Sequence, residues 1–126
     1  MTVLLDTSLL VRCAELGADP LELLESSLSE PFEPAVTRGV VRELEALASS
    51  GSHRRRAAAR TALEYVRRRG LSVLEDSGRG PADRGLLELA STLGAVVATA
   101  DRGLRDEALR RGLRALILWE SRRALV

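Results

Sequence analysis

Apolar positions along this chain follow two spacings, which together predict alternating strands and helices. Short uninterrupted apolar runs are typical of buried strands, and apolar residues three and four positions apart are typical of helices. Strands are predicted at residues 3–5, 32–36, 71–74, 95–100 and 115–118. Helices are predicted at residues 7–16, 20–28, 37–48, 53–69, 82–93 and 101–111, with a short tail at residues 119–126.

The order of these elements indicates the fold class. Strands separated by helices favour a parallel sheet that is covered by helices on both faces. The chain has 126 residues, which is enough for a substantial core, and it shows no repeat or linker. We therefore expect one α/β domain over residues 1–126, with three α/β/α layers around a five-stranded parallel sheet.

Composition narrows the class of protein. Hydrophobic residues make up 45% and charged residues 29%, an ordinary balance for a soluble domain. No apolar run is long enough for a membrane span and no signal-peptide pattern is present, so we expect a cytoplasmic protein with no membrane partner. One cysteine, Cys13, and one histidine exclude an internal disulfide and make a zinc site implausible.

Charge and aromatic content give less information about a partner. The formal net charge is +1, which does not by itself indicate a polyanion, and every basic side chain is arginine. Aromatic residues make up only 2% of the chain. This scarcity argues against a base-stacking platform of the kind that single-strand binders use.

Two of the predicted strands run directly into an aspartate. Asp6 follows the apolar residues 3–5, and Asp101 follows the mainly apolar strand predicted at residues 95–100. Ligands of open parallel sheets bind at the carboxyl ends of the strands. We therefore expect Asp6 and Asp101 to face the same crevice.

Two further acids share the apolar face of a predicted helix. Asp83 lies on the face that carries Leu86 and Leu87, and Glu43 lies on the face that carries Val40. Most other acids lie on polar faces. Both carboxylates are therefore expected to point inward.

Each of the four acids also has a purely structural interpretation. Asp6 and Asp101 can be helix N-caps. Asp83 lies in a first helical turn, where the dipole favours acids, and Glu43 can reach solvent from the edge of its face. Four acids in one crevice repel one another, however, and a buried charge is costly unless it is paired or bound to metal. A divalent cation with oxygen ligands, Mg²⁺ or Mn²⁺, would remove this cost.

The motifs that carry these acids resemble those of the PIN-domain nucleases. In chain order they are Leu-Asp-Thr-Ser at 5–8, Val-Val-Arg-Glu-Leu at 40–44, an Asp that opens a helix at 83–90, and a strand that ends in Thr-Ala-Asp at 96–101. The match follows essentially the whole chain in order. The C-terminal part looks most like the archaeal branch related to ribosomal-RNA processing nucleases, and VapC-type toxins are close behind.

The resemblance implies a sheet order, a reaction and a set of roles. The order 3-2-1-4-5 makes the first and fourth strands neighbours, at the roughly 4.8 Å spacing that lets Asp6 and Asp101 share one metal ion. The reaction is metal-dependent hydrolysis of RNA phosphodiester bonds with Mg²⁺ or Mn²⁺ as cofactor. Asp6, Asp83 and Asp101 would hold the metal. Glu43 would hold a second ion or orient the attacking water, so all four acids are candidate catalytic residues and metal ligands.

Three hydroxyl groups lie close to these acids in the sequence. They belong to Thr7, Ser8 and Thr99. We expect these hydroxyls to orient the carboxylates from behind. Helix capping and strand-end positions are the alternative interpretation, above all for Ser8.

The longest predicted helix, residues 53–69, is strongly basic. It carries seven arginines and a single acid, Glu64. Arg56, Arg60 and Arg67 follow one stripe and are candidates to contact an RNA backbone with salt-dependent affinity. The alternative is an ordinary solvated face, and His53 is expected in the first turn rather than as a catalytic base.

One rival interpretation keeps the fold and removes the activity. In a catalytically degenerate PIN domain the chain would act as an RNA-binding or scaffold module. Asp83-Arg84 favours this alternative, because the related branch often has paired aspartates there. No acid follows Asp101 within its first helical turn before Asp106, which leaves one or two metal ions open.

The sequence leaves two biological roles open, a toxin and an RNA-processing enzyme, and each implies a different partner. A toxin would have an antitoxin partner, whereas a processing enzyme would work with a ribosome-assembly partner. Dimerisation is common in the family, and residues 119–126 are a candidate for homodimer contacts. A phosphoryl-transfer receiver, which also places aspartates at strand ends, is disfavoured because it needs a lysine and this chain has none.

Overall fold

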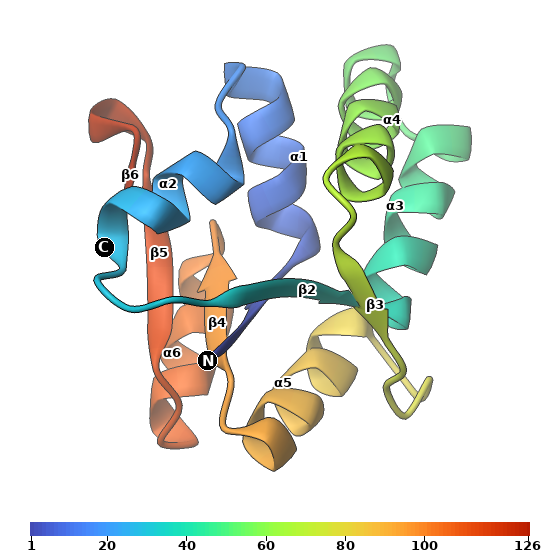
Figure 1. Cartoon of the computed structure of the whole chain (residues 1–126). Helices are drawn as coiled ribbons and strands as arrows, with labels where there is room; N and C mark the ends of the chain where they lie inside the picture. The colour runs from blue at the N-terminus through green and yellow to red at the C-terminus, as the bar shows by residue number, and fades with distance from the viewer.

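The computed structural model describes residues 1–126, and its elements follow the predicted order (Figure 1). The strands are β1 (Thr2–Leu5), β2 (Glu33–Thr37), β3 (Ser72–Leu74), β4 (Val96–Thr99), β5 (Ala115–Trp119) and β6 (Ala124–Leu125). The helices are α1 (Thr7–Leu16), α2 (Pro20–Ser27), α3 (Arg38–Ser50), α4 (His53–Arg68), α5 (Ala82–Leu93) and α6 (Arg102–Arg110). A short 3-10 turn, η1, covers Glu120–Arg122.

The sheet has the expected arrangement of parallel strands. The strand order is β3-β2-β1-β4-β5-β6. The central strand β1 pairs in parallel with β2 on one side and with β4 on the other. The β2–β3 and β4–β5 pairs are also parallel. The three-layer α/β/α fold and the order 3-2-1-4-5 are therefore confirmed, and the chain reverses its direction of winding between β1 and β4.

The C-terminal residues differ from the prediction of a tail. After Trp119 the chain turns back through η1 and Arg123, which adopts a left-handed φ of 46°. Residues 124–125 then pair antiparallel with β5, and Leu125 is buried at 3% exposure. The sheet therefore has six strands rather than five, because a two-residue strand is too short to produce a detectable apolar pattern.

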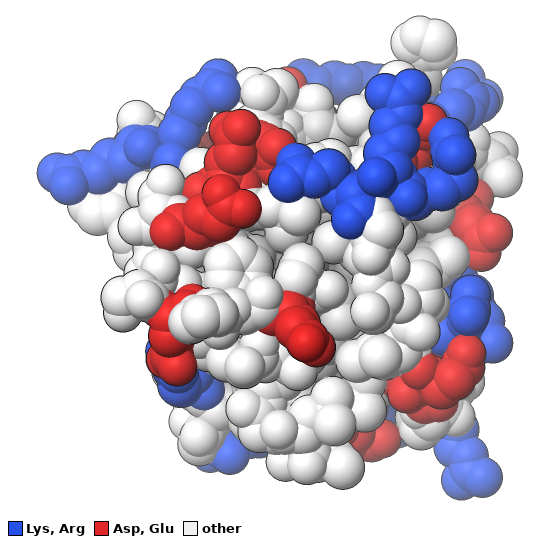
Figure 2. Space-filling view, viewed as in Figure 1, with Lys and Arg blue, Asp and Glu red and all other residues white.

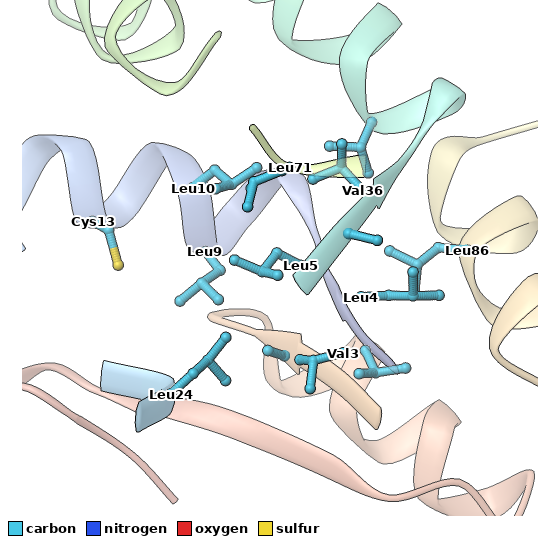
Figure 3. Close-up of a cluster of buried hydrophobic side chains, with 14 of the residues drawn as sticks. Val3, Leu4, Leu5, Leu9, Leu10, Cys13, Leu24, Val36, Leu71 and Leu86 are labelled. Atoms are coloured by element: carbon cyan, nitrogen blue, oxygen red, sulfur yellow. The ribbon is translucent and has the colours of Figure 1, made fainter. Parts of the chain in front are cut away.

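Helices cover both faces of the central strand. Val3, Leu4 and Leu5 of β1 are fully buried, as parallel strands between two helical layers require. Leu9 of α1 and Leu86 of α5 reach this core from different elements (Figure 3). In Figure 1, α1 and α4 lie above β2 and α5 lies below it. None of the helices combines the length and the apolar composition that a membrane span requires.

Candidate functional site

The structure brings the four candidate acids to the wall of one open pocket of about 460 Å³. We call it the acidic pocket, defined by Asp6, Glu43, Asp83 and Asp101. Asp6 follows β1 and Asp101 follows β4, so the reversal of winding between these strands places both at one edge of the sheet. Helices α3 and α5 supply the other two acids from the sides.

Asp6 is the buried member of this group, with 3% of its surface exposed. Its Oδ1 accepts the backbone N–H of Leu9 at 3.0 Å, which caps α1. The Ser8 hydroxyl lies 2.9 Å from both carboxylate oxygens, and Thr99 Oγ1 donates to Oδ2 at 2.9 Å. Burial raises the pKa of Asp6 to about 6, although these hydrogen bonds act in the opposite direction. Asp6 is thus both a helix cap and a wall of the pocket.

Two of the three candidate hydroxyls join the ends of β1 and β4. Thr99 Oγ1 donates to Asp6 and accepts the backbone N–H of Asp101 at 2.9 Å. Ser8 Oγ accepts the backbone N–H of Ala100 at 3.1 Å. Thr99 is completely buried. These contacts fix the relative positions of the two aspartates, which is the orienting arrangement that we expected of Ser8 and Thr99.

The expectation that Glu43 and Asp83 point inward is wrong. Both side chains are exposed, as is Asp101, and the three acids form the rim of the pocket. The inward positions on their helices belong to apolar residues, Leu44 beside Glu43 and Leu86 on α5, which are fully buried. The cost of burying a charge is therefore largest for Asp6, and it is smaller for the partly buried Asp83.

The four acids nevertheless interact electrostatically, because Asp83 interacts with each of the other three. Partial burial of Asp83 raises its pKa, and the charges of Glu43 and Asp101 raise it further. The charge of Asp83 in turn contributes to the raised pKa of Asp6. None of the four carboxylates forms an ion pair with an arginine. No direct ion pair therefore neutralises their negative charge.

The sequence has two differences from the related branch: Arg84 follows Asp83, and Asp106 is the first acid after Asp101. Arg84 and Asp106 both lie outside the acidic pocket. Arg84, which follows Asp83, does not line it, and its guanidinium lies beside Gly80 in the loop that follows β3. Asp106 is exposed and pairs with Arg105 at 3.1 Å. Arg84 therefore leaves the acids unneutralised, and Asp106 adds no carboxylate to them.

The three arginines singled out on α4 do not line the acidic pocket. Arg56 is partly buried, and its Nε has no hydrogen-bond partner. Arg60 is exposed, and Arg67 pairs with Glu64. Basic atoms gather at the top of the molecule, over the region of α4 (Figure 2). Contact with RNA through this stripe stays a prediction.

Sequence reasoning missed the basic residues that do line the pocket, Arg12 and Arg55. Arg12 pairs with Glu120 and, at 3.5 Å, with Glu15. Arg55 lies in the first turn of α4 and forms no ion pair. Arg12 follows Ser8 by one helical turn on α1, and that spacing was the signal that could have identified it.

Asp76 is a third residue that the sequence did not reveal. Its carboxylate accepts the backbone N–H groups of Gly39 at 3.2 Å and Gly78 at 3.1 Å. A Cβ at Gly39 would lie 2.7 Å from Asp76 Oδ2, and one at Gly85 would lie 2.8 Å from it. Asp76 therefore fills the space between the first turns of α3 and α5, the helices that carry two of the rim acids.

The residues present suit a hard divalent cation, although they are not drawn together as ligands. No three His, Cys, Asp or Glu side chains form a compact metal-binding group. The donors around the pocket are carboxylate oxygens, which Mg²⁺ and Mn²⁺ prefer. Thr7 also lines the pocket, but its buried Oγ1 has no hydrogen-bond partner, so the expectation that this hydroxyl orients a carboxylate is wrong.

A parallel sheet of this order between helical layers, with acids gathered where β1 and β4 end, defines the PIN-like class of domains. The family model described as PIN like domain matches residues 3–121, so the chain belongs to this family. The resemblance seen in the sequence motifs is thereby confirmed.

Solved structures show the same fold. The PIN domain endonuclease Utp24 superposes with a TM-score of 0.74 at 24% identity, covering 92% of this chain and 84% of that chain. VapBC-1 from nontypeable Haemophilus influenzae gives a TM-score of 0.64 at 17% identity, covering 93% and 98%. A domain of a functionally unknown protein from Methanocaldococcus jannaschii gives 0.64 at 19% identity, covering 93% and 90%. No curated protein matches the sequence.

Proposed function

We propose that this protein is a metal-dependent endoribonuclease that hydrolyses RNA phosphodiester bonds at the acidic pocket. One observation carries the proposal: four carboxylates from four separate elements line one pocket without a basic partner. Membership of the PIN-like family supports a nuclease role in general. The proposal further includes Mg²⁺ or Mn²⁺ as the metal ion and RNA as the substrate.

The residues of the acidic pocket have different roles in this proposal, and each role follows from the position of the side chain. Asp6 is held in one orientation by a helix N-terminus and two hydroxyls, so it provides a fixed oxygen donor. Asp83 and Asp101 are exposed at the rim and complete the donor set with Asp6, and Glu43 holds a second ion or orients water. A bound cation would lower the pKa of a coordinated water and stabilise charge on the phosphoryl oxygens. Arg55, unpaired at the same pocket, attracts the RNA backbone.

The test is cleavage of a labelled RNA during titration with Mg²⁺ and with Mn²⁺. The wild type should cut, and Asp6→Asn should lose more than the roughly 10- to 100-fold that loss of an outer partner of a metal ligand costs. Asp106→Asn is the matched control, because Asp106 is an exposed acid outside the pocket. Equal activity of the wild type and Asp6→Asn in the presence of metal would overturn the proposal.

A degenerate PIN domain that binds RNA or serves as a scaffold is the second candidate. The carboxylates are not gathered as ready-made ligands, and this favours it. The same titration separates the two functions. A degenerate domain would bind the labelled RNA with equal affinity in the chelator EDTA and in metal, and would leave it intact.

The biological setting is part of the proposal. We place the protein in the cytoplasm, acting either as a toxin with an antitoxin partner or as an RNA-processing enzyme with a ribosome-assembly partner. Expression of the chain alone separates these roles. A toxin arrests growth in a manner that Asp6→Asn abolishes, whereas a processing enzyme leaves growth unaffected.

A further inference from the structure

A second groove of about 650 Å³ borders the acidic pocket, and the two share Ala100 and Glu120 as lining residues. We call it the tryptophan groove. Its wall includes Arg102, Arg105, Ile117, Trp119, Ser121 and Val126. The groove therefore begins where the proposed cutting site ends, on the side of β5 and α6.

Trp119 is the only tryptophan of the chain, and 44% of it is exposed. A large aromatic side chain at the surface is unusual in a chain with only 2% aromatic residues, and it does not serve the core. The Arg122 guanidinium lies 4.4 Å from the centroid of the indole ring. This contact holds the ring from one side.

The charge of the groove differs from that of the acidic pocket. Arg102 forms no ion pair, and Arg105 pairs only with its exposed neighbour Asp106. Glu120, the shared acid, is held by Arg12. The acidic pocket suits a cation, whereas the adjoining groove offers guanidinium groups and an aromatic ring. That combination suits a nucleotide, which has an anionic phosphate and a flat base.

We infer that the tryptophan groove binds an unpaired nucleotide of the RNA next to the phosphodiester that is cut. The base stacks on Trp119, and the backbone phosphate contacts Arg102 and Arg105. The inference rests on the proposed function, and it requires an unpaired base at this groove because a base inside a duplex cannot leave its neighbours to stack on protein without unpairing.

The single tryptophan gives a direct readout of binding. The experiment uses the whole chain in EDTA, so that no cutting occurs, and follows tryptophan emission while a single-stranded oligouridylate is added. Emission should be quenched in a saturable manner. A blunt RNA duplex of the same length should quench it far less at equal phosphate concentration.

Variants test the two contacts separately by anisotropy of labelled oligouridylate. Trp119→Ala should weaken binding by about 5- to 150-fold, the effect of losing one stacked base. Trp119→Phe should retain most of the affinity, because it keeps a ring. Leu93→Ala is the matched control, since Leu93 is an apolar residue that is 49% exposed and does not line the groove.

Arg102→Gln should flatten the dependence of the binding constant on salt concentration by about one counterion. Arg110→Gln is the matched control on the same helix, because Arg110 does not line the groove and pairs with Glu107. Equal salt dependence of wild type and Arg102→Gln would show that Arg102 does not contact a backbone phosphate.

The outcomes distinguish this inference from the proposed function. A wild type that cuts RNA while Trp119→Ala matches it in affinity overturns the inference alone. A wild type whose emission is quenched but which cuts nothing in Mg²⁺ or Mn²⁺ overturns the proposed hydrolysis alone. If Trp119→Ala instead dissociates a homodimer and leaves RNA affinity unchanged, the groove belongs to a second copy of the chain and the inference fails.

Discussion

At the scale of the residue, Asp6 combines two roles that the sequence offered as alternatives. It caps α1 through the N–H of Leu9, and it is the one fully buried carboxylate of the acidic pocket. Capping fixes the orientation of the carboxylate. Burial removes water from around its charge, which raises the pKa of Asp6 to about 6. A residue in this state destabilises the metal-free fold at neutral pH and is a strong site for a cation.

The raised pKa of Asp6 predicts how stability depends on pH in the absence of metal. Between the usual value of 3.8 and about 6, the folded chain holds the proton of Asp6 more tightly than the unfolded chain. This contribution to the free energy of unfolding is therefore lost as pH rises from about 4 to 7, by up to ~3 kcal/mol. Asp6→Asn removes it, so the variant should gain stability relative to the wild type over this range.

Urea unfolding in EDTA at a series of pH values measures this difference. Comparing the two proteins at each pH cancels the contributions of titrating groups that do not interact with Asp6, which leaves the contributions of Asp6 and of its coupling to Asp83. A difference between wild type and Asp6→Asn that stays constant from acidic to neutral pH would contradict the raised pKa.

Thr99→Val tests the hydroxyl that joins the two strand ends. The variant keeps the shape of the side chain, but it removes the donor to Asp6 and the acceptor of the Asp101 N–H. We expect a loss of about 1–3 kcal/mol in stability from the unsatisfied buried groups and a roughly 10- to 100-fold loss of cleavage. Thr92→Val is the control, because that hydroxyl is exposed and bonds only within its own helix. Wild-type cleavage by Thr99→Val would show that the hydroxyl does not position the aspartates.

At the scale of the element, the pocket depends on how α3 and α5 are held beside the sheet. Asp76, in the loop between β3 and α5, accepts an N–H at the start of α3. Gly39 and Gly85 leave room for this carboxylate in the first turn of each helix. One side chain thus sets the spacing of two helices that carry Glu43 and Asp83.

Gly85→Ala should therefore destabilise the protein, although alanine is the better helix former. Its Cβ would lie 2.8 Å from Oδ2 and 3.0 Å from Cγ of Asp76, and such overpacking costs about 1–3 kcal/mol. In the background of Asp76→Ala the contacts with Oδ2 and Cγ are absent and only the Cβ of residue 76 remains close, at 3.2 Å, so the same change should destabilise much less. Unfolding of both single variants and the double variant measures the coupling. An equal effect of Gly85→Ala in both backgrounds would show that the two residues do not interact.

At the scale of the whole molecule, many acids pair with nearby arginines, but the four carboxylates of the acidic pocket do not. The carboxylates of the acidic pocket have no basic partner, whereas basic atoms gather over the region of α4 (Figure 2). The parallel sheet produces the first of these features, because its reversal of winding leads β1 and β4 to one edge. The result is a fold whose stability should respond to cations.

Mn²⁺ should therefore raise the melting temperature of the wild type. A ligand at about one hundred times its dissociation constant stabilises the folded state by roughly 2.7 kcal/mol, which corresponds to about 10 °C for a domain of this size. Asp6→Asn should show little of this shift. Differential scanning calorimetry with and without Mn²⁺ measures it, and an equal rise in Asp6→Asn would show that the ion binds elsewhere.

The sequence by itself determined the elements, their order, the α/β class and the two aspartates at strand ends. These features are local: a spacing of apolar residues or an acid directly after a strand is visible in a few consecutive positions. The family motifs added the strand order, which the structure confirms.

Only the tertiary structure decided what depends on contacts between distant segments. It placed Glu43 and Asp83 at an exposed rim, added β6 to the sheet, and put Asp76 between two helices. It also placed Trp119 beside the acidic pocket. Helical spacing shows which residues share a face, but the packing of that face against sheet, helix or solvent is set by the rest of the molecule.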